Sequence, residues 1–484
     1  MTFGPPPSEF TQSRQQARSR SRHRSYALVA CFVAVAVLLF GGWVFWPDAS
    51  DSSTELKKSS PAPAPDDIRE SVEARPKGGV GHLEATMMAR GVAPGKAQPT
   101  PGTWATDKVL VKGNGASLAA VKIGTAEEDA WTKHLPGPIC AAAPYVTVDG
   151  RTAVAYKGGT NKDPDACDHL MMFRLDTGER LWDRVIPWQA ASIAEPTRIT
   201  MTRGVVVATW WQGTAGVDMR SGHILWERGS TDQCSDAQVQ GGRALTVSYS
   251  CYPGTDYRDV RYRVQKLDPR SGRVVWTYHA ARYVIVHIVS SEPAVLAVAA
   301  GDDRVTDLLS LDKRGKHRAT IRMEKDHYQV QCDLEESETC TGAIVMDSSV
   351  YVLSGATSET LGNNTNWLVG FDLSTGKSGV KFDAGPNQQL HPIRRSGGRI
   401  LAVKEGTDQV APMSLVELDP ATGKERPYFS FTLPPDIRSG SAQNKMTVAV
   451  ENGRVFFGNS EVTGSGEERM PDAQWMAVGI GRAD

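Results

Sequence analysis

A short motif that returns along the chain constrains the fold more than any other feature of the sequence. Residues 267–276 read LDPRSGRVVW, and related stretches occur at 174–182, 217–226, 311–319, 371–380 and 418–427, with a degenerate version at 121–131. The copies lie about 40 to 60 residues apart, a period typical of architectures that repeat one small supersecondary unit. We therefore expect one large domain of stacked units.

Each unit contains short β-rich runs separated by turn residues. From residue 107 onward, runs of apolar and β-branched residues are bounded by Gly, Asp, Asn or Pro, and helical periodicity is almost absent. Aligned on the motif, each unit gives four antiparallel strands, with a D-x-x-[ST]-G turn between the third and the fourth. This order predicts an all-β protein, a β-propeller of four-stranded blades.

The motif residues have local structural roles. The Asp carboxylate can accept N–H bonds from the turn that follows it, and Gly adopts the left-handed conformation of a tight turn without a Cβ penalty. A Trp that recurs at one position is suited to packing between neighbouring blades. We assign such roles, and no catalytic role, to Asp176, Gly178, Trp182, Asp218, Gly222, Trp226, Asp268, Gly272, Trp276, Asp312, Gly315, Asp372, Gly376, Asp419 and Gly423.

The copies indicate eight blades, with seven as the alternative. Six copies carry the turn aspartate, Lys122 replaces it in the degenerate first copy, and residues 453–480 supply a last partial unit. In this count the first unit lacks its innermost strand and the last lacks its outermost strand. An N-terminal segment that supplied the missing strand would close the ring and remove the free sheet edges.

The pattern LDxxTGxxxW resembles the tryptophan-docking repeat of pyrroloquinoline-quinone-type propellers, a family that includes the outer-membrane assembly lipoprotein of the β-barrel machinery. The resemblance covers about residues 103–484 and implies a propeller scaffold. Enzymes of this family bind the quinone with Ca²⁺ beside a disulfide between adjacent cysteines, but this sequence has no Cys-Cys pair. We expect no enzyme activity, no cofactor and no metal, and a quinone-dependent dehydrogenase remains the alternative.

Three segments precede the repeats. Residues 1–25 form a basic tail, residues 26–46 are an uncharged apolar run, and residues 47–103 are rich in Pro, Ser, Ala and charge. The run is long enough to cross a bilayer, and the basic residues before it put the N-terminus in the cytoplasm. We predict a single transmembrane helix, a flexible linker and an extracellular propeller at 104–484. A cleaved signal peptide is the alternative, which the bulky WVFW ending disfavours.

The cysteine count agrees with an exported domain. Cys31 lies in the predicted span, which leaves six cysteines in the ectodomain. An even number in an oxidising compartment suggests three disulfides. The positions of the cysteines around predicted hairpins favour local pairs, namely Cys140 with Cys167, Cys234 with Cys251, and Cys332 with Cys340.

Charge and motifs exclude several function classes. The net charge is −1, and most of the positive charge lies in the first 25 residues, so the rest of the chain is mildly acidic. That balance gives no electrostatic footprint for nucleic acid. The sequence contains no GxSxG, HExxH or P-loop motif, and its ten histidines do not cluster.

The lengths of the connections suggest where a ligand binds. Turns between first and second strands are short, whereas connections between second and third strands are long and irregular, so the long loops should share one face. We expect this face of a monomeric ectodomain to bind a protein or an envelope ligand, with a sensor acting through a partner as another possibility. Candidate contacts are Trp210, Trp211, Tyr252, Asp256, Tyr257, Arg258, Asn363, Asn364 and Trp367.

Overall fold

The computed structural model describes most of the chain from residue 63 onward. The described residues are 63–70, 72–73, 79–125, 127–158, 166–187, 197–210, 213–229, 234–252, 259–301, 304–324, 327–332, 340–355, 365–407, 411–433, 446–464 and 473–482. They belong to one compact unit, Pro63–Asp484. The basic tail and the transmembrane helix predicted at 26–46 lie outside the described residues. In the part of the chain that the structure describes, no helix is long and apolar enough to span a membrane.

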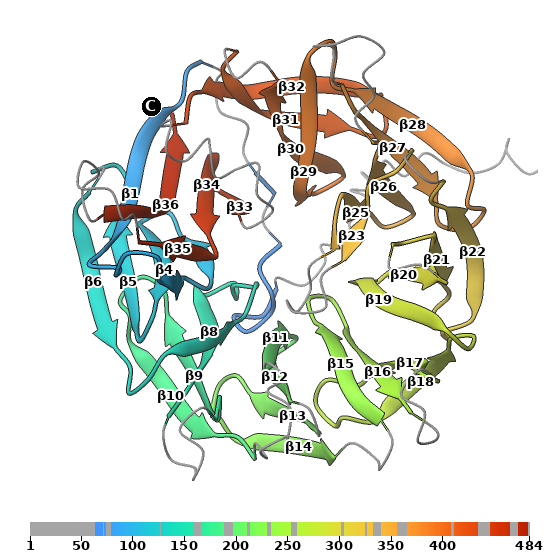
Figure 1. The fold of residues 1–484 in the computed structure, drawn as a ribbon, viewed down its shortest axis with the longest axis horizontal. Coiled ribbons are helices and arrows are strands. Elements are labelled where there is room, and N and C mark those ends of the chain that lie inside the picture. Colours follow the sequence, from blue (N-terminus) through green and yellow to red (C-terminus); the bar gives the residue numbers. More distant parts are fainter. Residues whose placement is uncertain are drawn as a thin grey trace, which may run out of the picture. The chain divides into compact units, whose positions relative to one another are not determined.

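Eight four-stranded antiparallel sheets stand around a central axis, and we number them as blades in chain order (Figure 1). Blade one contains β3 (Thr103–Ala105), β4 (Val109–Asn114), β5 (Ser117–Lys122) and β6 (Asp129–His134). Blade two contains β7 (Ile139–Ala142), β8 (Arg151–Tyr156), β9 (His169–Arg174) and β10 (Arg180–Val185). Blade three contains β11 (Arg198–Thr202), β12 (Val205–Trp210), β13 (Gly213–Asp218) and β14 (Ile224–Gly229). Blade four contains β15 (Cys234–Gln240), β16 (Leu245–Cys251), β17 (Arg261–Leu267) and β18 (Val274–His279).

The second half of the ring repeats this order. Blade five contains β19 (Val284–Ser291), β20 (Ala294–Ala300), β21 (Asp307–Leu311) and β22 (His317–Arg322). Blade six contains β25 (Ala343–Val345), β26 (Ser349–Leu353), β27 (Trp367–Asp372) and β28 (Ser378–Asp383). Blade seven contains β29 (Gln388–Ser396), β30 (Arg399–Gly406), β31 (Met413–Asp419) and β32 (Lys424–Phe431). Blade eight contains β33 (Met446–Glu451), β34 (Arg454–Asn459), β36 (Ala473–Gly481) and β1 (His82–Arg90). The predicted eight-bladed, all-β propeller is confirmed.

Two small hairpin-like pairs lie outside the blades. β2 (Ala97–Pro99) pairs with β35 (Glu461–Thr463), and β23 (Gln331–Cys332) pairs with β24 (Cys340–Thr341). The first pair joins the N-terminal segment to blade eight. The second pair lies in the connection between blades five and six, on the inner side of the ring in Figure 1.

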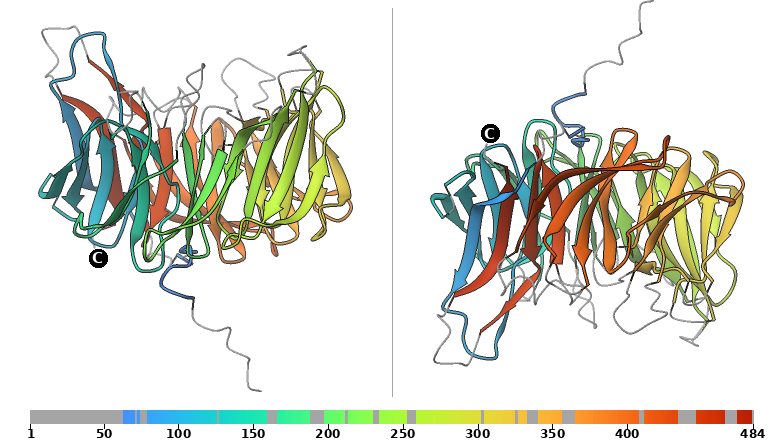
Figure 2. Two further views of the ribbon diagram at one scale, coloured as in Figure 1. Left: turned by 90° about the horizontal axis from the view of Figure 1, so that it is seen from below. Right: turned by 90° about the horizontal axis from the view of Figure 1, so that it is seen from above.

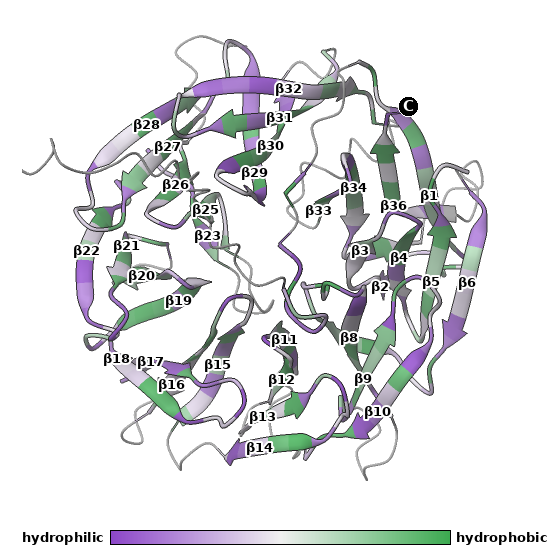
Figure 3. Cartoon of the chain, turned by 180° about the vertical axis from the view of Figure 1, so that it is seen from behind, coloured by the Kyte–Doolittle hydropathy of each residue, from purple (hydrophilic) through white to green (hydrophobic). Residues whose placement is uncertain are grey.

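Second strands are mostly buried, and outermost strands are more exposed. All six residues of β8 and all six of β12 are buried, because both faces of these second strands are covered by neighbouring blades. In contrast, β22 alternates between buried and exposed residues, as expected for an outermost strand with one face in solvent. Figure 3 shows hydrophilic residues concentrated along β22 and β6 at the rim.

Tryptophans on the outermost strands join successive blades. The indole N–H of Trp182 in blade two donates to the carbonyl of Met219 in blade three at 2.9 Å. Its ring covers Gly222, whose φ is 70°, and a Cβ added there would lie 2.8 Å from the ring. Both the left-handed turn and the close ring therefore require glycine. The same ring-over-glycine contact pairs Trp131 with Gly178, Trp226 with Gly272, and Trp276 with Gly315.

The turn aspartates hold the turns that receive these rings. The Asp218 carboxylate accepts the backbone N–H groups of Arg220 at 3.1 Å and Ser221 at 2.9 Å. In blade six, hydrogen bonds from the hydroxyls of Ser374 and Thr375 lower the pKa of Asp372 to about 2. Each turn therefore presents its glycine in a fixed position to the preceding blade.

The N-terminal strand β1 closes the ring. It pairs antiparallel with β36 from His82↔Gly481 to Arg90↔Ala473, which supplies the outermost strand that the last unit lacks. The flexible linker predicted for 47–103 is therefore wrong for the described residues 63–70, 72–73 and 79–103, and the propeller begins well before residue 104. The first blade is also complete, because the short strand β3 is its innermost strand.

The segment before β1 crosses the ring on one side, and we call residues 63–73 the strap (Figure 2). Its backbone carbonyls accept N–H groups from the turns of two blades: Asp67 from Val148 at 2.9 Å and Asp66 from Gly204 at 3.1 Å. The guanidinium of Arg69 donates to the carbonyl of Ala105 in blade one at 2.9 Å. These contacts tie blades one, two and three to a single strap.

The second half of the strap reaches the opposite blades. Glu70 forms a bidentate pair with Arg243 in blade four, both distances being 2.6 Å. The Glu73 side chain is only 1% exposed, and it accepts hydrogen bonds from Arg394 at 2.5 Å and from the N–H of Gly453 at 2.6 Å. A buried carboxylate with paired oxygens is costly to unpair, so this end of the strap is firmly held.

Removing β1 should destabilise the propeller much more than removing the residues before it. A chain that begins at residue 91 loses the buried side chains of Ala85, Met87 and Ala89 and leaves β36 with a free edge. We expect its free energy of unfolding to fall by at least about 3–5 kcal/mol relative to a chain that begins at residue 79. Urea denaturation of the two chains measures the difference. Equal midpoints would contradict closure by β1.

Candidate functional site

The turns and loops of the propeller divide between two faces. The short-turn face carries the turns between first and second strands, such as 203–204, and those between third and fourth strands, such as 219–223. The strap contacts this face. The long-loop face carries the connections between β8 and β9, between β16 and β17 and between β26 and β27, together with the connections between blades.

Three disulfides join residues at the long-loop ends of strands. Two of them link residues directly opposite each other in a hairpin, in β15 with β16 and in β23 with β24. The third links β7 to a cysteine two residues before β9. The pairs are Cys140–Cys167, Cys234–Cys251 and Cys332–Cys340. All three predicted pairings are confirmed, and each staples a connection on the long-loop face.

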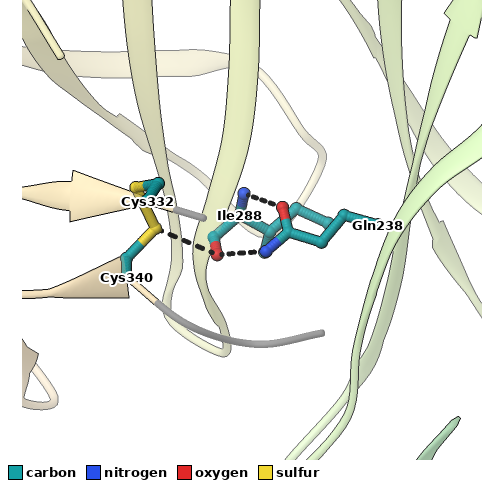
Figure 4. Close-up of a disulfide and its surroundings, with 4 residues drawn as sticks. All are labelled: Gln238, Ile288, Cys332 and Cys340. Carbon is teal, nitrogen blue, oxygen red and sulfur yellow. Dashed lines mark hydrogen bonds between the residues drawn. A yellow bond between two sulfur atoms is a disulfide. The ribbon is translucent and has the colours of Figure 1, made fainter. Parts of the chain in front are cut away.

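The Cys332–Cys340 hairpin rests on the inner wall of the ring (Figure 4). Cys340 Sγ lies 3.9 Å from the carbonyl oxygen of Ile288 on β19. The side-chain amide of Gln238 on β15 brackets the same peptide, because its Oε1 accepts the Ile288 N–H at 2.7 Å and its Nε2 donates to the Ile288 carbonyl at 3.3 Å. The amide joins the innermost strands of blades four and five just beneath the disulfide hairpin.

A polar cluster lies beside the Cys140–Cys167 disulfide in blade two. Tyr156 Oη donates to Asp183 Oδ2 at 2.5 Å, and His169 Nδ1 lies 3.0 Å from Asp183 Oδ1. Burial of the phenol, followed by its hydrogen bond to Asp183, raises the pKa of Tyr156. A phenol held in its protonated form donates a hydrogen bond and does not act as a base, so this cluster is suited to positioning the adjacent loop.

A second polar cluster lies between blades three and four. Asp236 on β15 is buried and accepts a hydrogen bond from the Thr214 hydroxyl of β13. Burial raises the pKa of Asp236 to about 7, although Arg228 and Arg263 oppose the shift. The Arg263 guanidinium lies 4.8 Å from the ring centroid of Tyr249, whose pKa burial also raises. Asp236 lies two residues from Cys234, directly below the stapled rim.

The predicted contact residues have different environments. Trp210 is only 6% exposed and packs against Gly213, so its assignment to the binding surface is wrong. Its position at the end of β12 places its ring in the core between blades. Tyr252 and Trp367 are half-buried, and Lys381 Nζ lies 3.7 Å above the ring of Trp367. The remaining candidates lie outside the described residues: Trp211, Asp256, Tyr257, Arg258, Asn363 and Asn364.

Among the described residues, no group of three or more His, Cys, Asp or Glu side chains is placed to hold a metal ion. Asp183 accepts hydrogen bonds from its own blade, and Asp236 accepts one from Thr214 of the neighbouring blade. Connections on the long-loop face are fixed at their bases by the three disulfide bonds.

Sequence reasoning missed the strap and both polar clusters. The strap carries acidic residues at 66, 70 and 73 and an apolar residue at 68, but the surrounding Pro-Ala sequence concealed this pattern. Asp236 could have been suspected because it lies close to Cys234 in a strand, where a buried charge is unusual. Its partners come from another blade, and the sequence does not identify them.

Comparison with known proteins identifies the type of propeller. Residues 214–377 match the model of a family described as outer membrane protein assembly factor BamB. That stretch contains four of the motif copies, with their aspartates at 218, 268, 312 and 372. The fold is a pyrroloquinoline-quinone-like β-propeller. The family match covers about a third of the chain, which leaves the activity of this propeller open.

Distant similarity to solved propellers accompanies this match. BamB from Moraxella catarrhalis is 14% identical with a TM-score of 0.41, over 82% of this chain and 99% of that one. Quinohemoprotein alcohol dehydrogenase from Comamonas testosteroni is 12% identical with a TM-score of 0.41, over 81% and 77% of the two chains. The β-propeller domain of the trilobed protease from Pyrococcus furiosus is 11% identical with a TM-score of 0.40, over 70% and 100%. No curated protein matches the sequence significantly.

Asp236 should make the stability of this propeller pH-dependent. Its folded pKa of about 7 lies above the ordinary value of 3.8, so between these values the folded chain holds a proton that the unfolded chain has released. The free energy of unfolding therefore declines by up to about 4 kcal/mol as the pH rises from about 4 to 7. Above pH 7 this contribution is level. Asp236→Asn should abolish this decline when the free energy of unfolding is measured against pH.

Asp268→Asn is the matched control. Hydrogen bonds from Ser271 lower the pKa of Asp268, so its contribution to stability is present above the ordinary pKa and is lost at lower pH. This variant should therefore fall progressively below the wild type as the pH rises toward about 4 and stay below it by a constant difference at higher pH, the opposite trend. A decline with pH that persists in Asp236→Asn would assign it to another group.

Proposed function

We propose that this chain is a non-enzymatic, membrane-anchored extracytoplasmic β-propeller that binds or scaffolds a protein or cell-envelope ligand through its long-loop face. The observation that carries the proposal is the strap. Residues 63–73 contact the short-turn face and engage blades around the ring, so that face carries a segment of the chain itself and we assign partner binding to the long-loop face.

The positions of the disulfides also support binding through the long-loop face. Disulfides persist in oxidising compartments outside the cytosol, and all three lie at bases of connections on the long-loop side. Loops fixed at their bases lose less conformational entropy when they bind, because part of the ordering cost is met before a partner arrives. A stapled rim on a rigid ring is therefore suited to specific recognition.

The position of the strap limits how far the propeller lies from the proposed membrane anchor. The strap lies on the short-turn face, where the Pro65 carbonyl accepts the Asp149 N–H at 3.2 Å. Between the predicted span at 26–46 and Pro63 lie roughly 16 residues, which extend to about 55 Å at most. An anchor at 26–46 would therefore hold the strap within about 55 Å of the bilayer.

Site-specific photo-crosslinking in cells tests the binding face. A crosslinking residue in place of Tyr252, on the long-loop face, should capture a discrete partner. The same residue in place of Val148, which is 38% exposed on the short-turn face, is the matched control and should not capture that partner. Mass spectrometry of the two products measures the difference. Capture of the same partner from Val148 alone would place binding on the wrong face.

A further inference from the structure

The short-turn face carries an arc of exposed basic side chains on three neighbouring blades. They occupy the turns between third and fourth strands and the start of the strand that follows. The arc consists of Arg220 in blade three, Arg270 in blade four, and Lys313, Arg314, Lys316 and Arg318 in blade five. Four cations within six residues make blade five its most basic part.

The acidic groups of these turns lie beneath the cations. Asp218, Asp268 and Asp312 are half-buried, and their carboxylates face the backbone N–H groups of their own turns. Arg270 also reaches Asp218 of the neighbouring blade at 3.2 Å. The long basic side chains therefore present the outermost charge of the arc to solvent.

The rest of this face does not share the charge. The corresponding turn of blade one exposes Glu127, Glu128 and Asp129. In blades six and seven, the turns after Asp372 and Asp419 each continue with a single lysine, Lys377 and Lys424. The basic arc is therefore confined to one side of the ring.

The arc and the strap share one face. Arg220 Nη2 lies 3.3 Å from Asp66 Oδ2 of the strap, so the arc begins where the chain enters the propeller. Next to the basic turns, Ile224 and Val274 are exposed by 38% and 42%. Cations flanked by exposed aliphatic side chains are a combination suited to the headgroup region of a bilayer.

We propose that the basic arc docks the propeller on the anionic headgroups of the membrane that anchors it. This inference rests on the proposed membrane anchor, and it adds that the propeller lies against the bilayer on its blade-three-to-five side. The tether of at most about 55 Å keeps the short-turn face close to the membrane. The attraction acts within a Debye length, about 8 Å at physiological salt, so the cations must contact the headgroup layer.

Vesicle sedimentation tests the arc without the anchor. The unit 63–484 closes its own ring through β1 and the strap, so it is used alone. It should bind vesicles of phosphatidylcholine with phosphatidylglycerol and should not bind vesicles of phosphatidylcholine, and high salt should release it. Since each cation near an anionic surface contributes roughly fivefold, Lys313→Gln, Arg314→Gln and Lys316→Gln together should weaken binding about a hundredfold.

A matched triple variant locates the effect. Arg90→Gln, Lys133→Gln and Arg322→Gln remove the same charge from exposed positions at the long-loop ends of outermost strands. This variant should bind as the wild type does. An equal loss in both variants would overturn the arc, as would no binding of the unit to phosphatidylglycerol.

Two further results separate this inference from the proposed function. Binding of the unit to soluble polyglutamate but not to the anionic vesicles would overturn the lipid assignment and favour an acidic protein. If the full chain stays in the membrane fraction and crosslinks its partner from Tyr252 while the unit ignores the vesicles, only the docking is wrong. If the full chain with the three Gln substitutions leaves the membrane at high salt, the predicted anchor does not hold the protein in the bilayer. Charge attraction from the arc then accounts for its binding to the membrane.

Discussion

The stacking of a tryptophan ring on a turn glycine of the next blade joins the first five blades of the ring. Trp182 illustrates it: the indole N–H bonds to the Met219 carbonyl while the ring covers Gly222, a position that tolerates no side chain. The contact joins the outermost strand of one sheet to the turn of its neighbour. Because it recurs at the four junctions from blade one to blade five, each of these sheets is oriented by the one before it.

A ring built this way needs a closure, and the N-terminal segment supplies two. β1 completes blade eight, and the strap then crosses the short-turn face to pair Glu70 with Arg243 and Glu73 with Arg394. The strap therefore has a structural role on the short-turn face. The disulfides act on the opposite face, where they fix the bases of long connections. The functional proposal is based on this difference between the two faces, the strap on one and the disulfides on the other.

Features set by local pattern could be predicted from the sequence, and features set by distant partners could not. Cys234 and Cys251 flank one hairpin, so their pairing follows from the chain itself. Closure by an N-terminal strand was expected, but β1 was not located because its partner β36 lies almost at the other end of the chain, and β3 was missed because three residues give too short a strand signal. Trp210 was misassigned because a loop-side position does not reveal burial, and the raised pKa of Asp236 depends on burial against another blade.

Hydrogen exchange of the strap amides tests the central claim most directly, since an occupied short-turn face is what assigns recognition to the other side. The Arg69 N–H donates to Val146 O at 2.8 Å, and the Glu73 N–H donates to Ser396 Oγ at 2.9 Å. Both amides should therefore exchange orders of magnitude more slowly than in a free peptide. Exchange at the free-peptide rate would mean that the strap does not cover the short-turn face, and the assignment of the long-loop face would lose its main support.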